Sequence, residues 1–160
     1  MKSMQTSRDR ITGLYTLSHA KITLADKLKE CDEHMNKLSM FYIVFPNASM
    51  LSVDALGKAI GELEKNHSGL SIDYVAYIAG SSFFAYFHHV GNAKNIPAMS
   101  VRSRIIEVIS RSTDMEFEVI ATTRQPMQNV NKHDYEAESE KILQYDLSNK
   151  IINLMNKYLK

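Results

Sequence analysis

The chain contains a single cysteine, Cys31, so no disulfide can form within it. Such a chain is compatible with the cytosol and equally with a disulfide-free periplasmic domain. No apolar run approaches the roughly 18 residues of a membrane helix, because the most apolar stretch, residues 74–87, is interrupted by Gly80-Ser81-Ser82. No signal peptide is visible at the N-terminus. We therefore expect no membrane contact by this segment itself.

An excess of positive charge is also lacking. The formal net charge is +1, which argues against a nucleic-acid binder that neutralises phosphates with Lys and Arg. The hydrophobic share of 44% is ordinary for a globular protein, and 160 residues fit one domain with a buried core. We therefore expect a single globular domain with no nucleic-acid partner.

Motifs for catalysis or metal binding are absent as well. The sequence has no Gly-rich phosphate loop, no nucleophile elbow and no HExxH, and its acidic residues are scattered. Cys31 and His34 share a helix face, but nothing near them in the sequence completes a metal site. His88 and His89 are adjacent in a predicted strand, so one should pack against the sheet and the other face solvent. We therefore predict no enzymatic activity, no cofactor and no metal.

The clearest pattern that is present is a heptad spacing of apolar residues near the N-terminus. One polar residue, Lys21, interrupts it, and no proline breaks it. The pattern predicts a long helix that either packs across its own domain or forms the seam of a homodimer. The seam positions are Leu14, Leu17, Lys21, Leu24, Leu28, Cys31, Met35 and Leu38.

The rest of the chain alternates between short apolar runs and helical patterns. Residues 40–45 are a short strand or the end of the first helix, and residues 142–147 are ambiguous between strand and helix. The remaining predicted elements are a helix over 53–63, a hairpin of strands 72–79 and 83–89, a helix over 101–108, a strand over 115–121 and a helix from 148 onward.

Two interpretations of this order remain open, both of them α+β with a central antiparallel sheet. In the first, the middle of the chain is β-α-β-β-α-β, the ferredoxin-like order, which would suit a non-enzymatic assembly or regulatory module of a multi-protein complex. This interpretation needs a helix at residues 142–147.

The second interpretation starts from three segments. These are the hairpin Asp73–Phe87, the strand Phe117–Met127 that ends in a proline, and residues 142–154, which contain Asp146 and run into a helix. Together they resemble the PAS-like extracytoplasmic sensor domains (PDC or Cache type) of bacterial histidine kinases, diguanylate cyclases and chemoreceptors. This interpretation needs a strand at residues 142–147, and it is the one we favour.

The resemblance implies a ligand-sensing domain of a membrane-bound bacterial receptor, located in the periplasm, with the cytoplasm as the alternative. It divides the chain into an N-terminal helix over 1–39, a sensor core over 40–147 and an exit helix over 148–160. It also implies a homodimer through the N-terminal helix and an unknown small-molecule or protein signal.

The resemblance further implies where such a ligand would bind. An Arg pair could hold a carboxylate, an Asp could accept from an ammonium group, and a Tyr could close the apolar wall. The positions that match the family are Tyr77, Arg102, Arg104 and Asp146.

Overall fold

The fold is described from a computed structural model, in which residues 7–47, 53–65, 72–128 and 130–158 are described. The helices are α2 (Leu17–Glu33), α3 (Val53–Gly61), α4 (Ala98–Ser112), α5 (Tyr135–Glu140) and α6 (Leu147–Tyr158). The strands are β1 (Leu38–Val44), β2 (Tyr74–Ala79), β3 (Ser82–His88) and β4 (Glu118–Arg124). Short 3₁₀ turns lie at Glu62–Glu64, Gly91–Ala93 and Val130–Lys132, and a π-helical segment spans Lys141–Asp146.

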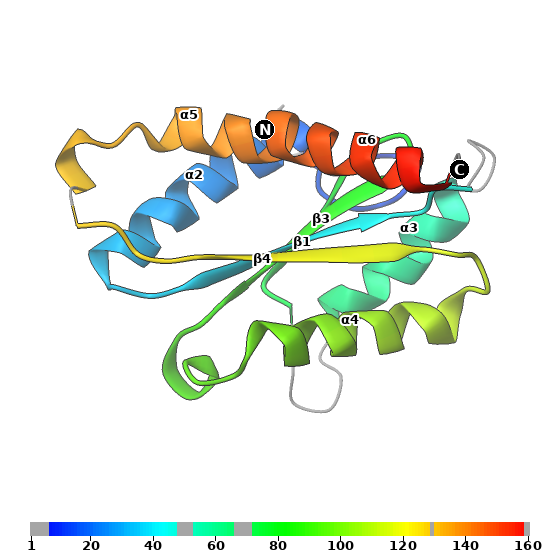
Figure 1. Cartoon of the computed structure of the whole chain (residues 1–160), viewed down its shortest axis with the longest axis horizontal. Coiled ribbons are helices and arrows are strands. Elements are labelled where there is room, and N and C mark those ends of the chain that lie inside the picture. The colour runs from blue at the N-terminus through cyan, green and yellow to red at the C-terminus, as the bar shows by residue number, and fades with distance from the viewer. Residues whose placement is uncertain (1–6, 48–52, 66–71, 129, 159–160) are drawn as a thin grey trace.

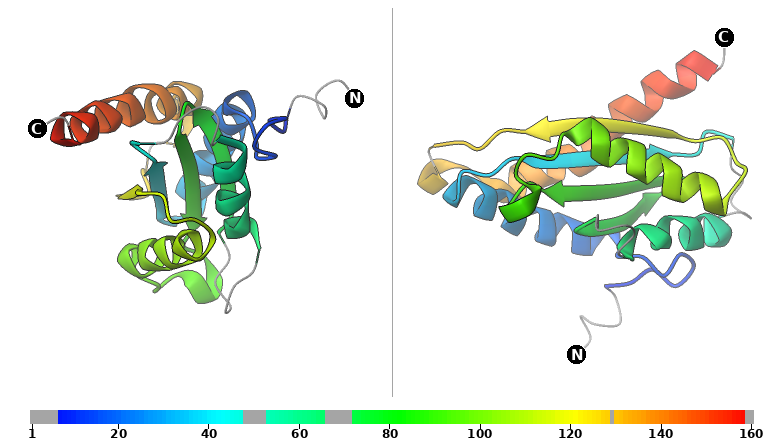
Figure 2. Two further views of the ribbon diagram at one scale, coloured as in Figure 1. Left: turned by 90° about the vertical axis from the view of Figure 1, so that its right-hand side faces the viewer. Right: turned by 90° about the horizontal axis from the view of Figure 1, so that it is seen from below.

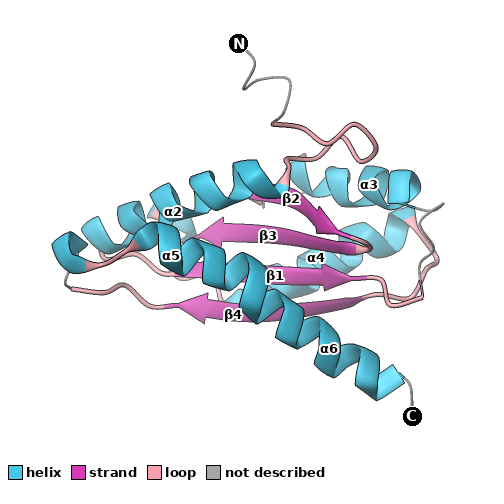
Figure 3. Cartoon of the chain, turned by 90° about the horizontal axis from the view of Figure 1, so that it is seen from above, coloured by secondary structure: helices cyan, strands magenta, loops and turns pink. Residues whose placement is uncertain are grey.

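The four strands form one sheet in the order β2-β3-β1-β4, and every neighbouring pair is antiparallel. Strand β1 lies in the interior of the sheet, and all seven of its residues are buried. This explains why its sequence is an almost continuous apolar run without polar alternation, since both faces of the sheet are covered. Figure 3 shows the strands with α2, α5 and α6 lying across them.

From β1 to β4 the elements follow the order β-α-β-β-α-β, which is compatible with a ferredoxin-like sheet. Figure 1 and Figure 2 show α3 and α4 on one face of the sheet, and α2, α5 and α6 on the other. The predicted α+β class with an antiparallel sheet is confirmed. The PAS-like arrangement is not.

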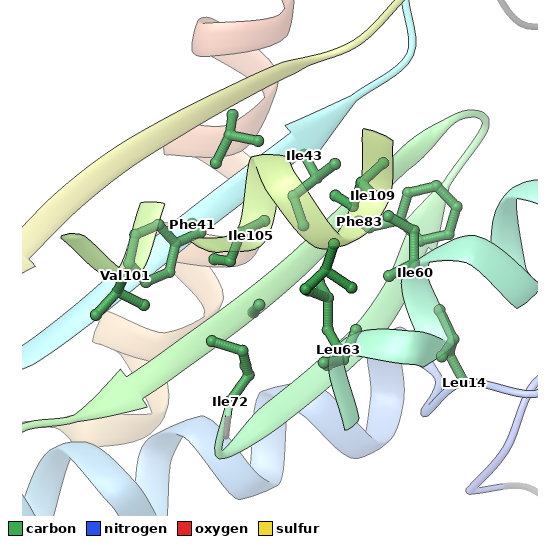
Figure 4. Close-up of a cluster of buried hydrophobic side chains, with 14 of the residues drawn as sticks. Leu14, Phe41, Ile43, Ile60, Leu63, Ile72, Phe83, Val101, Ile105 and Ile109 are labelled. Atoms are coloured by element: carbon green, nitrogen blue, oxygen red, sulfur yellow. The ribbon is translucent and has the colours of Figure 1, made fainter. Parts of the chain in front are cut away.

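The core under α3 and α4 consists mainly of apolar side chains. Side chains such as Phe41, Ile43 and Phe83 from the sheet meet Ile60 from α3 and Ile105 from α4, all of them fully buried (Figure 4). Their burial supplies a favourable free energy that grows with apolar area and needs no particular hydrogen-bond geometry.

The N-terminal helix packs on the opposite face of the sheet. This packing bears on whether the heptad spacing marks a dimer seam or contact within one chain. Leu24 and Leu28 are fully buried beneath α2 against the sheet, while Leu17 packs at the edge of the same core. The helix ends at Glu33 and is followed by Met35, an exposed residue with φ of 56°. The spacing is therefore satisfied within one chain, so the seam side chains that are buried cannot contact a second copy.

The remaining seam residues do not belong to one element. Leu14 precedes α2 and belongs to the core under α3, Leu38 begins β1, and Lys21 and Cys31 lie on α2. The apolar spacing therefore continues across a loop, because the segment before the loop and the segment after it are each buried in a core.

The segment at residues 142–147 is helical, so the strand that the sensor interpretation required there is wrong. Buried or half-buried residues recur exactly four apart along this arm, at Tyr135, Ser139, Leu143, Leu147 and Ile151. A spacing of four drifts by about 40° at each step around an α-helix of 3.6 residues per turn. The π-helical turn holds one more residue than an α-helical turn. This corrects the drift, so the buried residues beyond the turn face the sheet again.

Candidate functional site

The β2–β3 turn and the end of β1 meet at one end of the sheet, which we call the hairpin end. It comprises Phe45–Asn47 and the turn Ala79–Ser82. Gly80 has φ of 57°, a conformation that other residues adopt only with strain, and its carbonyl accepts a hydrogen bond from the Tyr77 hydroxyl at 2.8 Å. The turn is thus held in a defined shape by its own side chains.

Two hydrogen bonds join this turn to β1. The Ser81 hydroxyl donates to the carbonyl of Phe45 at 2.8 Å, and the Phe45 N–H donates to the carbonyl of Ser81 at 3.1 Å. These bonds fix the turn against the end of β1. The turn therefore offers hydroxyl and backbone groups but no charged side chain.

Carboxylates near this edge come from the start of β4. Glu116 accepts from Asn47 at 3.4 Å, and Glu118 lies 3.8 Å from the Lys157 ammonium group. Across the described residues no three His, Cys, Asp or Glu side chains are grouped so that they could hold a metal ion. The described part of the hairpin end thus offers single carboxylates that already have partners.

The strongest electrostatic feature lies at the opposite end of β4, and we call it the Arg124 cluster. The Arg124 guanidinium donates two hydrogen bonds to Asp32 at 2.8 and 2.9 Å and two to Glu138 at 2.6 and 3.0 Å. Asp32 also accepts from the Tyr135 hydroxyl at 2.6 Å and from the Met127 N–H at 2.8 Å. The cluster thus links α2, β4 and α5 through one buried cation.

These contacts decide the ionisation of the cluster. Burial disfavours charge on Asp32, but the hydrogen bonds from Arg124, Tyr135 and Met127 outweigh it and lower its pKa to about 2. Burial and the bond to Asp32 raise the pKa of Tyr135 to about 12, so its hydroxyl remains a donor. The pairing also raises the pKa of Arg124 above its ordinary value. The cluster is therefore ionised at neutral pH and anchors the C-terminal helices to α2 and β4.

Sequence reasoning did not find the Arg124 cluster. Asp32 and Arg124 are 92 positions apart, and Tyr135 lies 103 positions from Asp32. A lone acidic residue at the end of a predicted helix is ordinarily solvated, so nothing local distinguished it.

The four predicted ligand-binding residues do not converge. Tyr77 lies at the hairpin end, whereas Arg102 donates to the Val119 carbonyl at 2.8 Å and Arg104 pairs with Glu107. Asp146 belongs to the π-helical segment, which lies over the opposite face of the sheet from α4. The two arginines share α4 but have different partners, and neither hollow found among the described residues is lined by more than one of the four.

The histidines differ from expectation too, because neither of the adjacent pair faces solvent. His88 and His89 are 6% and 1% exposed. Cys31 is buried among apolar side chains, and burial raises the pKa of its thiol to about 11, as expected for a core residue.

Two of the surface hollows have a lining that lies within the described residues. The larger, of about 700 Å³, lies between α2 and α5 and is lined by both lysines and acidic residues, among them Lys21 and Glu136. The smaller, of about 370 Å³, lies beside α4 and the start of β4. Neither includes the hairpin end.

Comparison with known proteins finds no matching protein-family model and no matching curated protein. Solved structures do match. The GGDEF domain of FimX from Pseudomonas aeruginosa superposes with a TM-score of 0.59 at 16% identity, covering 92% of this chain and 94% of that one. A DGC protein from Thermotoga maritima matches with a TM-score of 0.57 at 17% identity, covering 88% and 98%.

The coiled coil and GGDEF domain of DgcB from Caulobacter crescentus, solved in complex with c-di-GMP, has a TM-score of 0.59 at 14% identity, with 92% of this chain and 81% of that chain covered. At these identities the likeness establishes the fold: the chain is similar in structure to GGDEF domains.

This likeness corrects the functional predictions. The resemblance to extracytoplasmic PDC or Cache sensors is wrong, because the matching structures are GGDEF domains. The predicted periplasmic sensing function is therefore wrong, and the alternative of a ferredoxin-like assembly module is not supported either. The prediction that the chain is not an enzyme is corrected too, since this is a fold of diguanylate cyclases. No described helix is long and apolar enough to span a membrane.

Proposed function

We propose that this chain is a degenerate diguanylate cyclase-type domain that acts in cyclic di-GMP signalling. The proposal rests on one observation: a GGDEF-type fold carries a hairpin turn in which serines stand at the positions of two carboxylates.

The name GGDEF spells Gly-Gly-Asp-Glu-Phe, and this pentapeptide does not occur in the chain. Adjacent glycines followed by polar residues are typical of a hairpin turn. The turn between β2 and β3 reads Ala79-Gly80-Ser81-Ser82-Phe83. Its glycine and phenylalanine stand at matching places, while Ser81 and Ser82 replace the aspartate and the glutamate.

This replacement matters chemically. Joining nucleoside triphosphates is phosphoryl transfer, in which Mg²⁺ ions held by carboxylates neutralise the developing charge. A serine hydroxyl carries no charge, and the Ser81 hydroxyl is already bound to the Phe45 carbonyl. We therefore expect cyclisation of GTP to be slow or lost, while binding of a guanine nucleotide is retained.

The proposal also implies where the domain is located and what it binds. We place the domain in the cytoplasm, because the structural likeness is to cyclase domains and not to extracytoplasmic sensors. Cyclic di-GMP is the expected ligand, since matching GGDEF domains include one solved with it. A protein partner or a second copy is also expected, since a matching diguanylate cyclase, SiaD, was solved with its activator SiaC.

Isothermal titration calorimetry with GTP and with cyclic di-GMP, in Mg²⁺ buffer, tests the binding. Chromatographic detection of cyclic di-GMP after incubation with GTP tests the turnover. We expect saturable binding of at least one nucleotide. The absence of binding by both would refute the proposal, whereas rapid product formation would show an active cyclase and refute only its degenerate character.

A pair of double variants sharpens the assignment of the turn. Ser81→Asp with Ser82→Glu restores both carboxylates, and Ser81→Asn with Ser82→Gln adds the same bulk without charge. We expect the acidic pair to make GTP binding dependent on Mg²⁺ and the amide pair to leave it independent. If the two pairs respond to Mg²⁺ alike, the turn has been assigned wrongly.

A further inference from the structure

Two adjacent histidines are buried where β3 ends, one beneath each layer of helices. His88 lies against α2, with its Nδ1 3.5 Å from a carboxylate oxygen of Glu30. The His89 ring points the other way, toward Ser39 and edge-on to Phe87, a residue of the core under α3 and α4. Neither ring takes part in the proposed nucleotide chemistry, so their burial needs another reason.

His89 connects three strands. Its Nε2 lies 2.6 Å from the Ser39 hydroxyl on β1, and this hydroxyl lies 3.1 Å from the Thr123 hydroxyl on β4. The His89 N–H also donates to the carbonyl of Lys37 at 3.1 Å. The ring therefore anchors the end of β3 at the point where the chain leaves the sheet for residues 90–97 and α4.

The charges around His89 are unfavourable for a proton. The charged groups that act on it, Lys37 and His88, are both basic, and its Nδ1 has no hydrogen-bond partner among the described residues. Backbone groups of Ala93 and Ile96 in the following loop favour protonation, but burial outweighs them. No carboxylate among the described residues is found to act on the ring.

His88 differs in this respect. Glu30 from α2 lies beside its ring, and Asp73, which precedes β2, accepts its backbone N–H at 2.6 Å. Lys27 on α2 and His34, the residue that follows this helix, oppose these two acids. A proton on His88 would thus meet carboxylates, whereas a proton on His89 would meet only backbone groups of Ala93 and Ile96.

We propose that His89 is an acid-sensitive switch that releases residues 90–97 and the start of α4 from the end of the sheet. A cation at this fully buried position, with basic neighbours and no acidic partner, is costly, so the protonated ring leaves for solvent. Its departure breaks the contact with Ser39 and frees the loop that leads to α4. The inference does not depend on the proposed nucleotide chemistry.

The direction of the pH effect follows from the burial. Burial is the largest influence on His89 and holds its pKa below the ordinary value of 6.5. The folded state thus binds the proton less readily than the unfolded state. The stabilisation is complete above about pH 6.5 and is lost as the pH falls below it.

Hydrogen exchange of the intact chain, read by mass spectrometry between pH 7.5 and 5, tests the switch. After correction for intrinsic exchange, we expect the opening of residues 90–101 to rise by up to roughly tenfold per pH unit, because one proton is taken up on opening. The core strand β1 should not follow this change.

Three variants identify the group responsible. His89→Gln keeps a neutral hydrogen-bonding side chain and should flatten the pH dependence, with the exchange of β1 reporting an intact fold. His88→Gln and the control His133→Gln, whose native ring is partly buried and pairs with Glu138 of the Arg124 cluster, should retain it. If His89→Gln fails to fold, the ring is titrated in the native chain by NMR.

An NMR titration in which His89 protonates at or above its ordinary pKa without local opening would overturn the proposal. So would an unchanged pH dependence of exchange in His89→Gln.

Discussion

The helices on the two faces of the sheet are stabilised by different kinds of interaction. Under α3 and α4 the contacts are apolar side chains, such as Phe41 against Ile105, whose burial tolerates small displacements. Under α2, α5 and α6 an apolar core is also present, but the Arg124 cluster and the π-helical turn fix how those helices sit. The stability of the first face depends on the apolar area that is buried. The stability of the second depends also on specific hydrogen-bonded and charged partners.

This difference matters for how each face fails. Removing apolar area weakens packing in proportion to what is lost, whereas removing one member of a buried ionic network leaves its partners charged and unsatisfied. The following experiments separate these behaviours, and they are ordered by the size of the expected effect.

The largest effect is expected from Arg124→Met. The change leaves the Asp32 carboxylate, which is fully buried, without its cation, and breaking such a pair costs about 3–5 kcal/mol. Urea unfolding followed by circular dichroism measures this loss. Arg111→Met is the matched control, because Arg111 is exposed and its pairing with Glu107 should contribute less than about 1 kcal/mol. Equal losses in both variants would contradict an anchoring role for Arg124.

On the apolar face, Ile105→Ala should cost about 2–5 kcal/mol, because it removes a fully buried side chain and leaves a cavity. This loss should be the same at pH 3 and pH 7, since the described side chains of its core cluster are apolar. The same unfolding assay at both pH values checks it. A loss that depends strongly on pH would show that the two faces are not independent.

Strong acid should weaken the ionic face. The Asp32 pKa of about 2 lies below its value of about 3.9 in an unfolded chain, so the folded state is favoured whenever the carboxylate is ionised. This contribution, about 2 kcal/mol, is complete above pH 4 and disappears as the pH falls toward 2. Asp32→Asn should remove this part of the pH dependence of the unfolding free energy. A profile unchanged by the substitution would contradict the assignment.

The smallest effect is expected from deleting Gln144. The deletion converts the spacing of Ser139, Leu143, Leu147, Ile151 and Leu154 from 4-4-4-3 to 4-3-4-3, which suits a continuous α-helix. We expect a change in unfolding free energy within about 1 kcal/mol.

Deleting Lys150 is the matched comparison, because it turns Ile151 and Leu154 away from the sheet and should cost more. Thermal melts of both variants measure the difference. If the deletion of Gln144 is the more harmful, the π-helical turn has a role beyond phasing.

Local patterns identified most elements of the sheet correctly. The apolar run at residues 40–45 became β1, and the two aromatic-rich runs around Gly80 became the predicted hairpin. The last strand was displaced: Met115 and Phe117 alternate as in a strand, but pairing begins at Glu118, opposite Val44. Side-chain alternation marks which residues can be buried, and the partner strand decides where pairing starts.

The functional predictions were less successful. The heptad spacing predicted a helix but could not show that Leu24 and Leu28 face the chain's own sheet, because one apolar stripe fits either surface. The resemblance to sensor domains depended on a strand at residues 142–147, and the four residues it selected are divided between separate parts of the fold.

Composition and periodicity alone were enough for the α+β class, the helix beneath the heptad spacing and the hairpin, because local backbone preferences and apolar burial act over a few residues. The likeness to GGDEF domains, the pairing of Arg124 with Asp32 and the burial of His89 required the folded chain. Each of these depends on groups brought together across 50 positions or more. Interactions over such distances leave no local periodicity, since only the packing of the sheet and its helices brings those groups within reach of one another.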